Sequence, residues 1–183
     1  CSSLFVKSDN LVFVGGSSSS QTDAGLNAQI KITEFSEVYS GTLLDYDANG
    51  PKALCVTREI SPMDASVSYS LVYYDGNLAY QMTSSDIPIT EGAIDAQTGD
   101  VYYKESNTSA SVASLYMIDS ERNTKTKITN DIPSSLLSFA LASDGTLMYS
   151  DRDGIYIYSG GESSKVASLD VQCSVKKIIY LKN

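Results

Sequence analysis

Ser70-Leu-Val-Tyr-Tyr-Asp75-Gly76 is an apolar run that ends in a turn, and the same pattern returns as Ser114-Leu-Tyr-Met-Ile-Asp119-Ser120. Each run leads to an Asp-Ile-Pro tripeptide, which begins at Asp86 in the first copy and at Asp131 in the second. The copies are about 45 residues apart, a period that is typical of repeat architectures. In such proteins one unit cannot bury its own apolar face, and stacking of neighbouring units supplies the core.

The second half of the unit is repeated as well. A turn that contains glycine comes before a strand that ends in tyrosine, with Gly99 before Tyr103 and Gly145 before Tyr149. A third, weaker copy begins at Ile155-Tyr-Ile-Tyr158. We therefore predict a single repeat domain over residues 1–183, with a diverged first unit at about 1–60 and clearer repeats at about 67–181.

The composition and the turn spacing both favour strands. The chain has 13 Tyr and no Trp, glycine-bearing turns recur about every ten residues, and no long stretch shows an apolar stripe at helical spacing. These features predict an all-β fold of antiparallel units. Self-similar units favour a β-propeller, with about four blades or as the end of a larger ring, over the alternative of a β-sandwich. The serine-rich stretch 15–25 predicts an exposed polar loop.

The repeat has an Asp-Gly turn before a Leu-Tyr or Val-Tyr strand, and it ends in Lys127-Ile-Thr129. In these features it resembles the propeller-type repeats of bacterial surface and periplasmic proteins, including those related to TolB. The resemblance covers about residues 67–181. It implies a propeller-like array in an extracytoplasmic or cell-surface protein.

Charge and composition exclude several classes of partner and of chemistry. The net charge is −9, so the field of the protein repels nucleic-acid phosphates and anionic lipid headgroups. The chain has no histidine, which removes the commonest general base and the commonest metal ligand. No apolar run approaches the roughly 20 residues that a membrane-spanning helix needs. We expect a protein or a glycan as the partner, and no nucleic acid.

Cys1-Ser-Ser resembles the mature end of a bacterial lipoprotein, in which the first cysteine carries lipid. This resemblance implies a lipid anchor at Cys1, and the membrane would then be contacted only through that anchor. The alternative, which we favour, is a fragment that happens to begin there. Cys55 lies in a strand-like stretch, where a buried free thiol is expected.

Asp45-x-Asp47-x-Asn49-Gly50 has the opening of a calcium loop, because three oxygen-bearing side chains at alternate positions can converge on one ion. Calcium is accordingly the one cofactor that the sequence suggests. The later carboxylates of such a loop are missing, since Ala53 and Val56 occupy their positions. We therefore favour a plain hairpin turn, which also requires Asx residues and glycine.

Tyrosines recur at matching places of the units, and one tyrosine of each pair is expected to face outward. An outward row of Tyr74, Tyr103 and Tyr158 would stack on sugars or hold a protein partner. The alternative, which we favour, is packing in the core and across strands.

Three functions agree with these observations. The first is a non-enzymatic binding or scaffold module that contacts a protein or glycan through loops at its rim. The second is a carbohydrate-active hydrolase whose carboxylates converge on a propeller face, with these candidates: Glu59, Asp64, Glu91 and Asp95. The third is a structural subunit of a surface assembly. We expect the function to lie where the units differ, at 15–25, 45–50 and 106–111.

Overall fold

The computed structural model describes residues 3–7, 10–15, 18–22, 41–47, 52–75, 79–122, 124–170 and 178. Within these ranges every regular element is a β-strand and every strand pair is antiparallel, so the predicted all-β class is confirmed. The described part of the chain contains no helix long and apolar enough to cross a membrane. The chain divides into two compact units, Cys1–Ile94 and Asp95–Asn183. The single domain over 1–183 stays a prediction.

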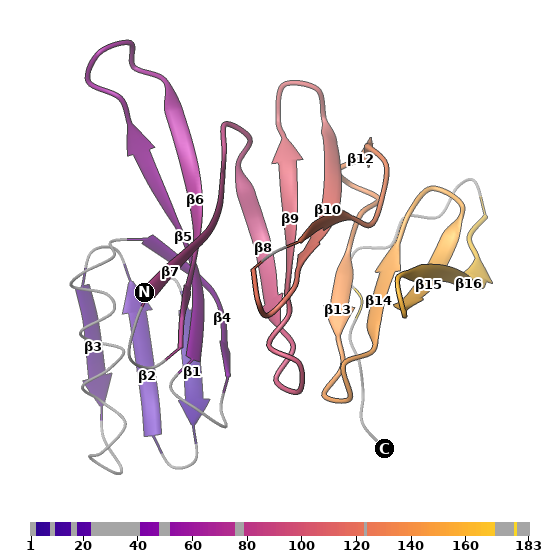
Figure 1. Ribbon diagram of the computed structural model, residues 1–183, viewed down its shortest axis with the longest axis horizontal. Helices are drawn as coiled ribbons and strands as arrows, with labels where there is room; N and C mark the ends of the chain where they lie inside the picture. Colours follow the sequence, from indigo (N-terminus) through magenta and orange to yellow (C-terminus); the bar gives the residue numbers. More distant parts are fainter. Residues whose placement is uncertain are drawn as a thin grey trace. The chain divides into compact units, whose positions relative to one another are not determined.

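The first unit begins with a three-stranded antiparallel meander (Figure 1). Its strands are β1 (Ser3–Lys7), β2 (Asn10–Gly15) and β3 (Ser18–Thr22). β3 pairs along its length with β2, from Gly15 opposite Ser18 to Leu11 opposite Thr22. The loop predicted for 15–25 is thus wrong in this part, because backbone hydrogen bonds to β2 form a strand without any apolar residue.

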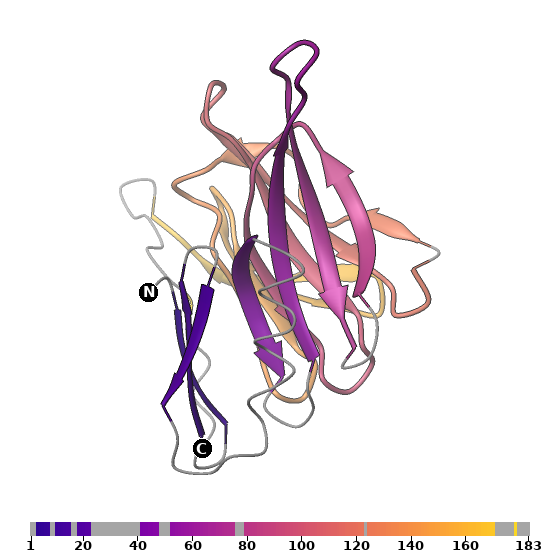
Figure 2. The ribbon, with the colours of Figure 1, turned by 90° about the vertical axis from the view of Figure 1, so that its left-hand side faces the viewer.

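The second sheet of this unit contains four consecutive strands, which Figure 2 shows as a twisted ladder. They are β4 (Gly41–Asp47), β5 (Lys52–Ile60), β6 (Val67–Tyr74) and β7 (Ala79–Ser85). Leu54 of β5 and Leu71 of β6 are fully buried. The last strand of the unit, β8 (Ile89–Ile94), packs against β4 and β5. The Ile94 N–H donates to Asp45 Oδ2 at 2.8 Å, which ties β8 to β4.

The second unit continues with a meander whose outer strand is interrupted. β9 (Val101–Asn107) pairs with β10 (Val112–Ile118), and two short strands share the far edge of β10: β11 (Lys125–Lys127) and β12 (Ile132–Pro133). Between these short strands, the Leu115 N–H donates to Thr129 Oγ1 at 3.0 Å, and Ser114 Oγ donates to Asp131 Oδ1 at 2.7 Å. The Lys-Ile-Thr and Asp-Ile-Pro sequences therefore shape a strand break, since their side chains replace the missing ladder bonds.

The last sheet is again a four-stranded meander. Its strands are β13 (Phe139–Leu141), β14 (Leu147–Ser150), β15 (Gly154–Ser159) and β16 (Glu162–Ser168). Its inner face and one face of β9 and β10 form the core of the second unit, with these buried members: Tyr102, Ala113, Leu115, Leu137, Leu147, Tyr149 and Tyr158. Burial of this apolar surface is the main stabilising contribution within the unit.

The glycine turns of the repeat are confirmed. Gly99, before β9, and Gly145, before β14, both have φ of +82°, a conformation that side chains with a Cβ rarely adopt. The N–H of each glycine donates back into its own turn, to Asp95 O at 2.8 Å and to Ala142 O at 3.0 Å. Four-stranded meanders in sequence are the form that propeller blades take, and they are also compatible with a sandwich. The arrangement of these meanders as propeller blades stays a prediction.

Candidate functional site

A pocket of about 500 Å³ lies in the second unit, where three turns come together. The first turn, 95–100, leads into β9, the second, 142–146, joins β13 to β14, and the third, 159–161, joins β15 to β16. The last two lie at the same end of one sheet, because every second turn of a meander lies at the same end of its strands. The pocket is therefore built on turns that the sheets hold in place.

The first turn supplies Asp95, Gln97, Thr98 and Asp100 to the pocket wall. Asp95 is only 4% exposed, and its Oδ1 accepts hydrogen bonds from the Gln97 N–H at 2.8 Å and the Thr98 N–H at 3.4 Å. Asp100 Oδ1 accepts from the Ser120 N–H at 2.8 Å. Both carboxylates are thus held in one orientation by main-chain N–H groups, whose positions are set by the turns themselves.

A hydrogen bond connects the second turn to the first. Gln97 Nε2 donates to the Ser143 carbonyl at 3.1 Å, and Asp144 Oδ1 accepts from the Thr146 N–H at 3.0 Å. A Cβ placed on Gly145 would lie 2.8 Å from Asp95 Oδ2. Glycine is therefore needed at position 145 for two reasons, the positive φ and the close approach of the Asp95 carboxylate.

Two tyrosines, a methionine and a threonine line the pocket between the turns: Tyr102, Tyr158, Met117 and Thr126. Burial, together with the smaller effect of the nearby carboxylates of Asp100 and Asp95, raises the pKa of Tyr102 from 10.0 to about 12. The Tyr102 phenol is therefore neutral at physiological pH and can donate a hydrogen bond.

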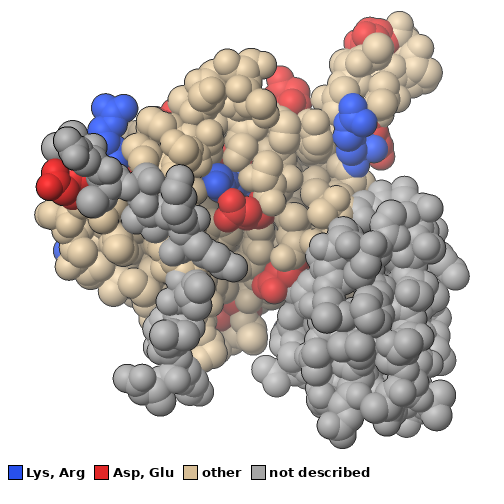
Figure 3. Space-filling view, turned by 180° about the vertical axis from the view of Figure 1, so that it is seen from behind, with Lys and Arg blue, Asp and Glu red and all other residues tan. Residues whose placement is uncertain are grey.

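The pocket is electronegative. Asp95, Asp100 and Asp144 line it, and none of the described lining residues is Lys or Arg. Among the described residues no group of three His, Cys, Asp or Glu side chains is arranged to hold a metal ion. Figure 3 shows one face of the molecule, on which charged side chains are scattered over a mostly uncharged surface. Asp95, Asp100 and Asp144 make the wall of the pocket acidic.

The tyrosines that the sequence suggested for binding lie in the core. Tyr74 is 9% exposed, Tyr103 is fully buried and Tyr158 is 8% exposed. Both tyrosines at 102 and 103 are buried, because β9 is covered on both faces, so the expected outward partner is missing there. All three side chains are buried, and of the three only Tyr158 lines the pocket, so a binding role for these tyrosines stays a prediction.

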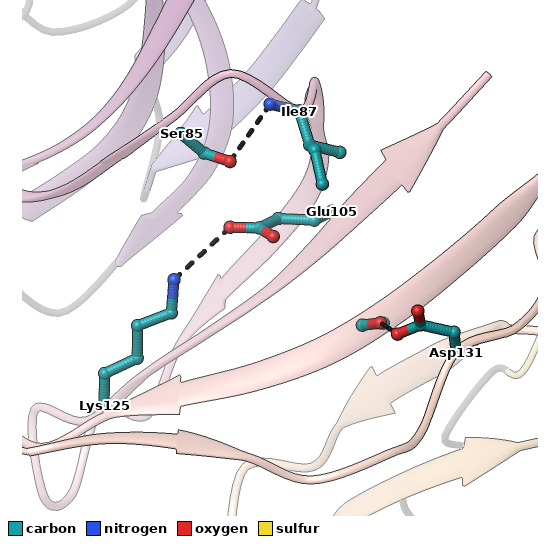
Figure 4. A network of polar contacts seen from close by, with 6 residues as sticks. Ser85, Ile87, Glu105, Lys125 and Asp131 are labelled. Atoms are coloured by element: carbon teal, nitrogen blue, oxygen red, sulfur yellow. Dashed lines mark hydrogen bonds and ion pairs between the residues drawn. The ribbon is translucent and has the colours of Figure 1, made fainter. Parts of the chain in front are cut away.

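Tyr103 belongs to a stacked ladder of aromatic and charged side chains. Its ring stacks on Tyr116 with centroids 5.3 Å apart, and Lys125 Nζ lies 4.5 Å from the Tyr116 centroid. The same ammonium is 3.4 Å from Glu105 Oε1 (Figure 4). Lys127, on the same strand β11, bonds Asp131, which Figure 4 also labels. These charges compensate one another, and we assign them to strand pairing and not to ligand binding.

The suggested calcium ligands are only partly described. Asp45 and Asp47 lie in β4, while Asn49 lies outside the described residues, as does the suggested lipid-anchor residue Cys1. Asp45 Oδ2 accepts the Ile94 N–H, so one oxygen of this carboxylate already has a structural role. Calcium binding at this turn stays a prediction. Cys55 is a buried free thiol, as expected.

The four carboxylates suggested for a hydrolase lie on different elements. Glu59 is an exposed residue of β5, Asp64 lies in the β5–β6 turn, Glu91 is an exposed residue of β8, and Asp95 opens the turn before β9. Asp64 Oδ1 accepts from the N–H and the hydroxyl of Ser66, which stabilises its own turn. Of the four, only Asp95 lines the pocket.

Sequence reasoning did not propose Asp100, Asp144 or Tyr102 as binding residues, and it did not predict a pocket at the repeated turns. A signal was present, because Asp100 and Asp144 each flank a turn glycine, Gly99 and Gly145, of the two best copies. Such residues are also what any hairpin turn requires, so their type alone does not reveal a shared pocket.

No protein-family model and no curated protein matches this sequence. Among solved structures, the chain is similar to a protein of B. thetaiotaomicron described as the extracellular domain of a one-component system, BT4673, with a TM-score of 0.50 and 11% identity. The likeness covers 96% of this chain and 24% of that one, so this chain spans about a quarter of the neighbour's length. At this identity the likeness shows the all-β fold alone, and the relation to TolB-type repeats stays a prediction.

Proposed function

We propose that the chain is a non-enzymatic binding module of an extracytoplasmic protein, and that the pocket at the three turns of the second unit is its ligand site. The observation that carries this proposal is the pocket itself, with fixed carboxylates, a neutral phenol and an apolar wall around about 500 Å³. Ligand sites are concave and combine apolar walls with a few oriented polar groups. The extracellular neighbour supports the extracytoplasmic location.

The size of the pocket favours a small molecule or the end of a glycan over a folded protein surface. Cavities of roughly 300–1,000 Å³ hold ligands of that size, and a tyrosine beside carboxylates suits the faces and hydroxyls of a sugar. Contacts to a protein would then use the outer sides of the turns. If Cys1 carries lipid, the module would be attached to a membrane by that anchor.

Binding explains the site better than catalysis does. The Oδ1 atoms of Asp95 and Asp100 accept backbone N–H groups, which fix the orientation of these carboxylates. A glycoside hydrolase needs a pair of carboxyl groups on either side of the scissile bond, and of the four carboxylates suggested for that role only Asp95 lines the pocket. The three acidic residues keep a glycoside hydrolase as the second candidate, and release of phenolate from aryl glycosides tests it.

A tryptophan reporter tests the proposed function. The chain contains no Trp, so a Ser159→Trp variant places the only indole at the rim of the pocket. Ser164→Trp, on an exposed position of β16 outside the pocket, is the matched control. Both variants are titrated with a panel of soluble oligosaccharides and amino sugars while indole fluorescence is recorded.

We expect at least one compound to change the fluorescence of Ser159→Trp in a saturable manner and to leave Ser164→Trp unchanged. The signal should disappear in Ser159→Trp protein that is unfolded in urea. Equal responses of the two variants, or no saturable response to any compound, would count against a ligand site at these turns.

A further inference from the structure

The orientation of the pocket carboxylates gives information about the charge of the ligand. Within the described part of the chain, the hydrogen bonds that the carboxylates of Asp95 and Asp100 accept all end on Oδ1. Oδ2 of Asp95 instead points toward Gly145, at 2.8 Å from the place of a Cβ. Only 4% of the surface of Asp95 is exposed. Asp95 Oδ2 is not among the fully enclosed, unpaired side-chain atoms of the described residues, so it can accept a hydrogen bond from a ligand in the pocket.

A neutral ligand would bind in this pocket at a cost in desolvation free energy. It would displace water from three carboxylates, and none of the described lining residues is a cation that could compensate them. A cationic ligand compensates the charge on entering, because opposite charges attract strongly where water is excluded. The net charge of −9 also enriches cations around the protein.

A bare metal ion does not fit the arrangement. The three carboxylates line one pocket, yet no group of three acidic side chains among the described residues is arranged to hold a metal. The carboxylates are therefore distributed around a space that requires a larger body. Tyr102 and Tyr158 line the same space, and aromatic rings beside carboxylates form the usual environment of organic ammonium groups.

We propose that the pocket binds an organic cation, a small molecule with a protonated amine or a quaternary ammonium group, through Asp95, Asp100 and the rings of Tyr102 and Tyr158. This inference rests on the proposed function, since it names the ligand class of the same site. The ammonium group lies toward the Oδ2 atoms, and the remainder of the ligand lies against the tyrosines and Met117.

Matched pairs of probes test the inference on the full chain. D-Glucosamine is compared with D-glucose, and choline with its uncharged carbon isostere 3,3-dimethylbutan-1-ol, by titration of the Ser159→Trp reporter. We expect the charged member of at least one pair to bind at least about tenfold more tightly than its neutral analogue, the gain expected for an ammonium group at a partly desolvated aromatic site.

Charge-neutral variants locate the effect. Asp95→Asn and Asp100→Asn keep the shape and the Oδ1 acceptor, and each should weaken binding of the charged probe by at least about fivefold. Asp153→Asn removes the same charge at an exposed turn outside the pocket and should change binding by less than about twofold. Urea unfolding of each variant shows that it is folded.

The outcomes separate the two proposals. If the neutral probes bind saturably and with the same affinity as the charged probes, the cation inference is wrong, whereas the proposed binding site is supported. Equal weakening by Asp153→Asn and Asp100→Asn would also overturn it, because general charge would then explain the preference. If neither cationic probe binds, the inference is wrong, and the broader panel of the preceding section then decides on the proposed function.

Discussion

Replacing Gly145 by alanine should destabilise the protein, because two separate costs meet at this position. The φ of +82° is unfavourable for a residue with a Cβ, by about 1–2 kcal/mol. The new Cβ would in addition lie 2.8 Å from Asp95 Oδ2, closer than such atoms approach. Asp95 cannot simply swing away, since its Oδ1 accepts two backbone N–H groups of the 95–100 turn.

The magnitude follows from these contacts. Moving the Asp95 carboxylate weakens at least one hydrogen bond to a charged acceptor, which contributes about 1.5–3 kcal/mol. Alanine also restricts the unfolded chain, which offsets about 0.4–1 kcal/mol of the loss. We expect Gly145→Ala to lower the free energy of unfolding by about 2–4 kcal/mol. Gly160→Ala meets no atom within 4 Å at a φ of +61°, so its cost should stay near the backbone value of about 1 kcal/mol.

Urea denaturation followed by circular dichroism measures both values. A double-mutant cycle with Asp95→Ala isolates the contact, because the Gly145→Ala cost should fall by about 1–2 kcal/mol when the carboxylate is absent. Additive costs for Gly145→Ala and Asp95→Ala, or equal costs at positions 145 and 160, would refute the close approach of the two turns.

Three further predictions concern the core and two shifted pKa values. Leu115→Ala, at a fully buried position, should cost about 2–5 kcal/mol in urea unfolding, whereas Met63→Ala, at a side chain that is 93% exposed, should change stability by less than about 0.5 kcal/mol. Burial raises the pKa of the Cys55 thiol from 9.0 to about 12, so at pH 8 iodoacetamide should modify it about a thousandfold more slowly in the native protein than in urea, as peptide mass mapping will show. The pKa of Tyr102 is raised from 10.0 to about 12, so its contribution to stability is complete below pH 10 and is lost as the pH rises toward about 12, and Tyr102→Phe should remove a late component from the phenolate absorbance titration.

The repeat made much of the fold predictable. The turn glycines at 99 and 145 and the repeated apolar runs predicted the fold class and the positions of β6, β9, β10 and β14, because a turn with positive φ and a pleated apolar run are local requirements. The strand at Ser18–Thr22 could not be found in this way. Its residues carry no apolar pattern, and only the neighbouring β2 supplies the hydrogen bonds that define it.

Side-chain roles were less predictable than strands. Alternation along a strand predicts one inward and one outward tyrosine, but both faces of β9 are covered, so Tyr102 and Tyr103 are both buried. The same limit applies to the pocket. Asp95 and Asp144 are 49 residues apart in sequence, and the bond from Gln97 Nε2 to Ser143 O that joins their turns depends on how two sheets pack. A pattern of residue types does not contain that information.

The position of the pocket changes where function should be sought in this repeat. We expected it where the units differ in sequence, yet the cavity lies at the turns that the copies share. The shared glycine brings each turn to the same end of its sheet, and the turns then differ in detail: the Gly99 N–H bonds a carbonyl four residues back, and the Gly145 N–H one three residues back. The first turn carries Gln97, whose Nε2 donates to Ser143 O of the second turn, and the missing Cβ of Gly145 leaves room for the Asp95 carboxylate. The copies thus supply two similar glycine turns, and the contacts between these turns form part of the pocket wall.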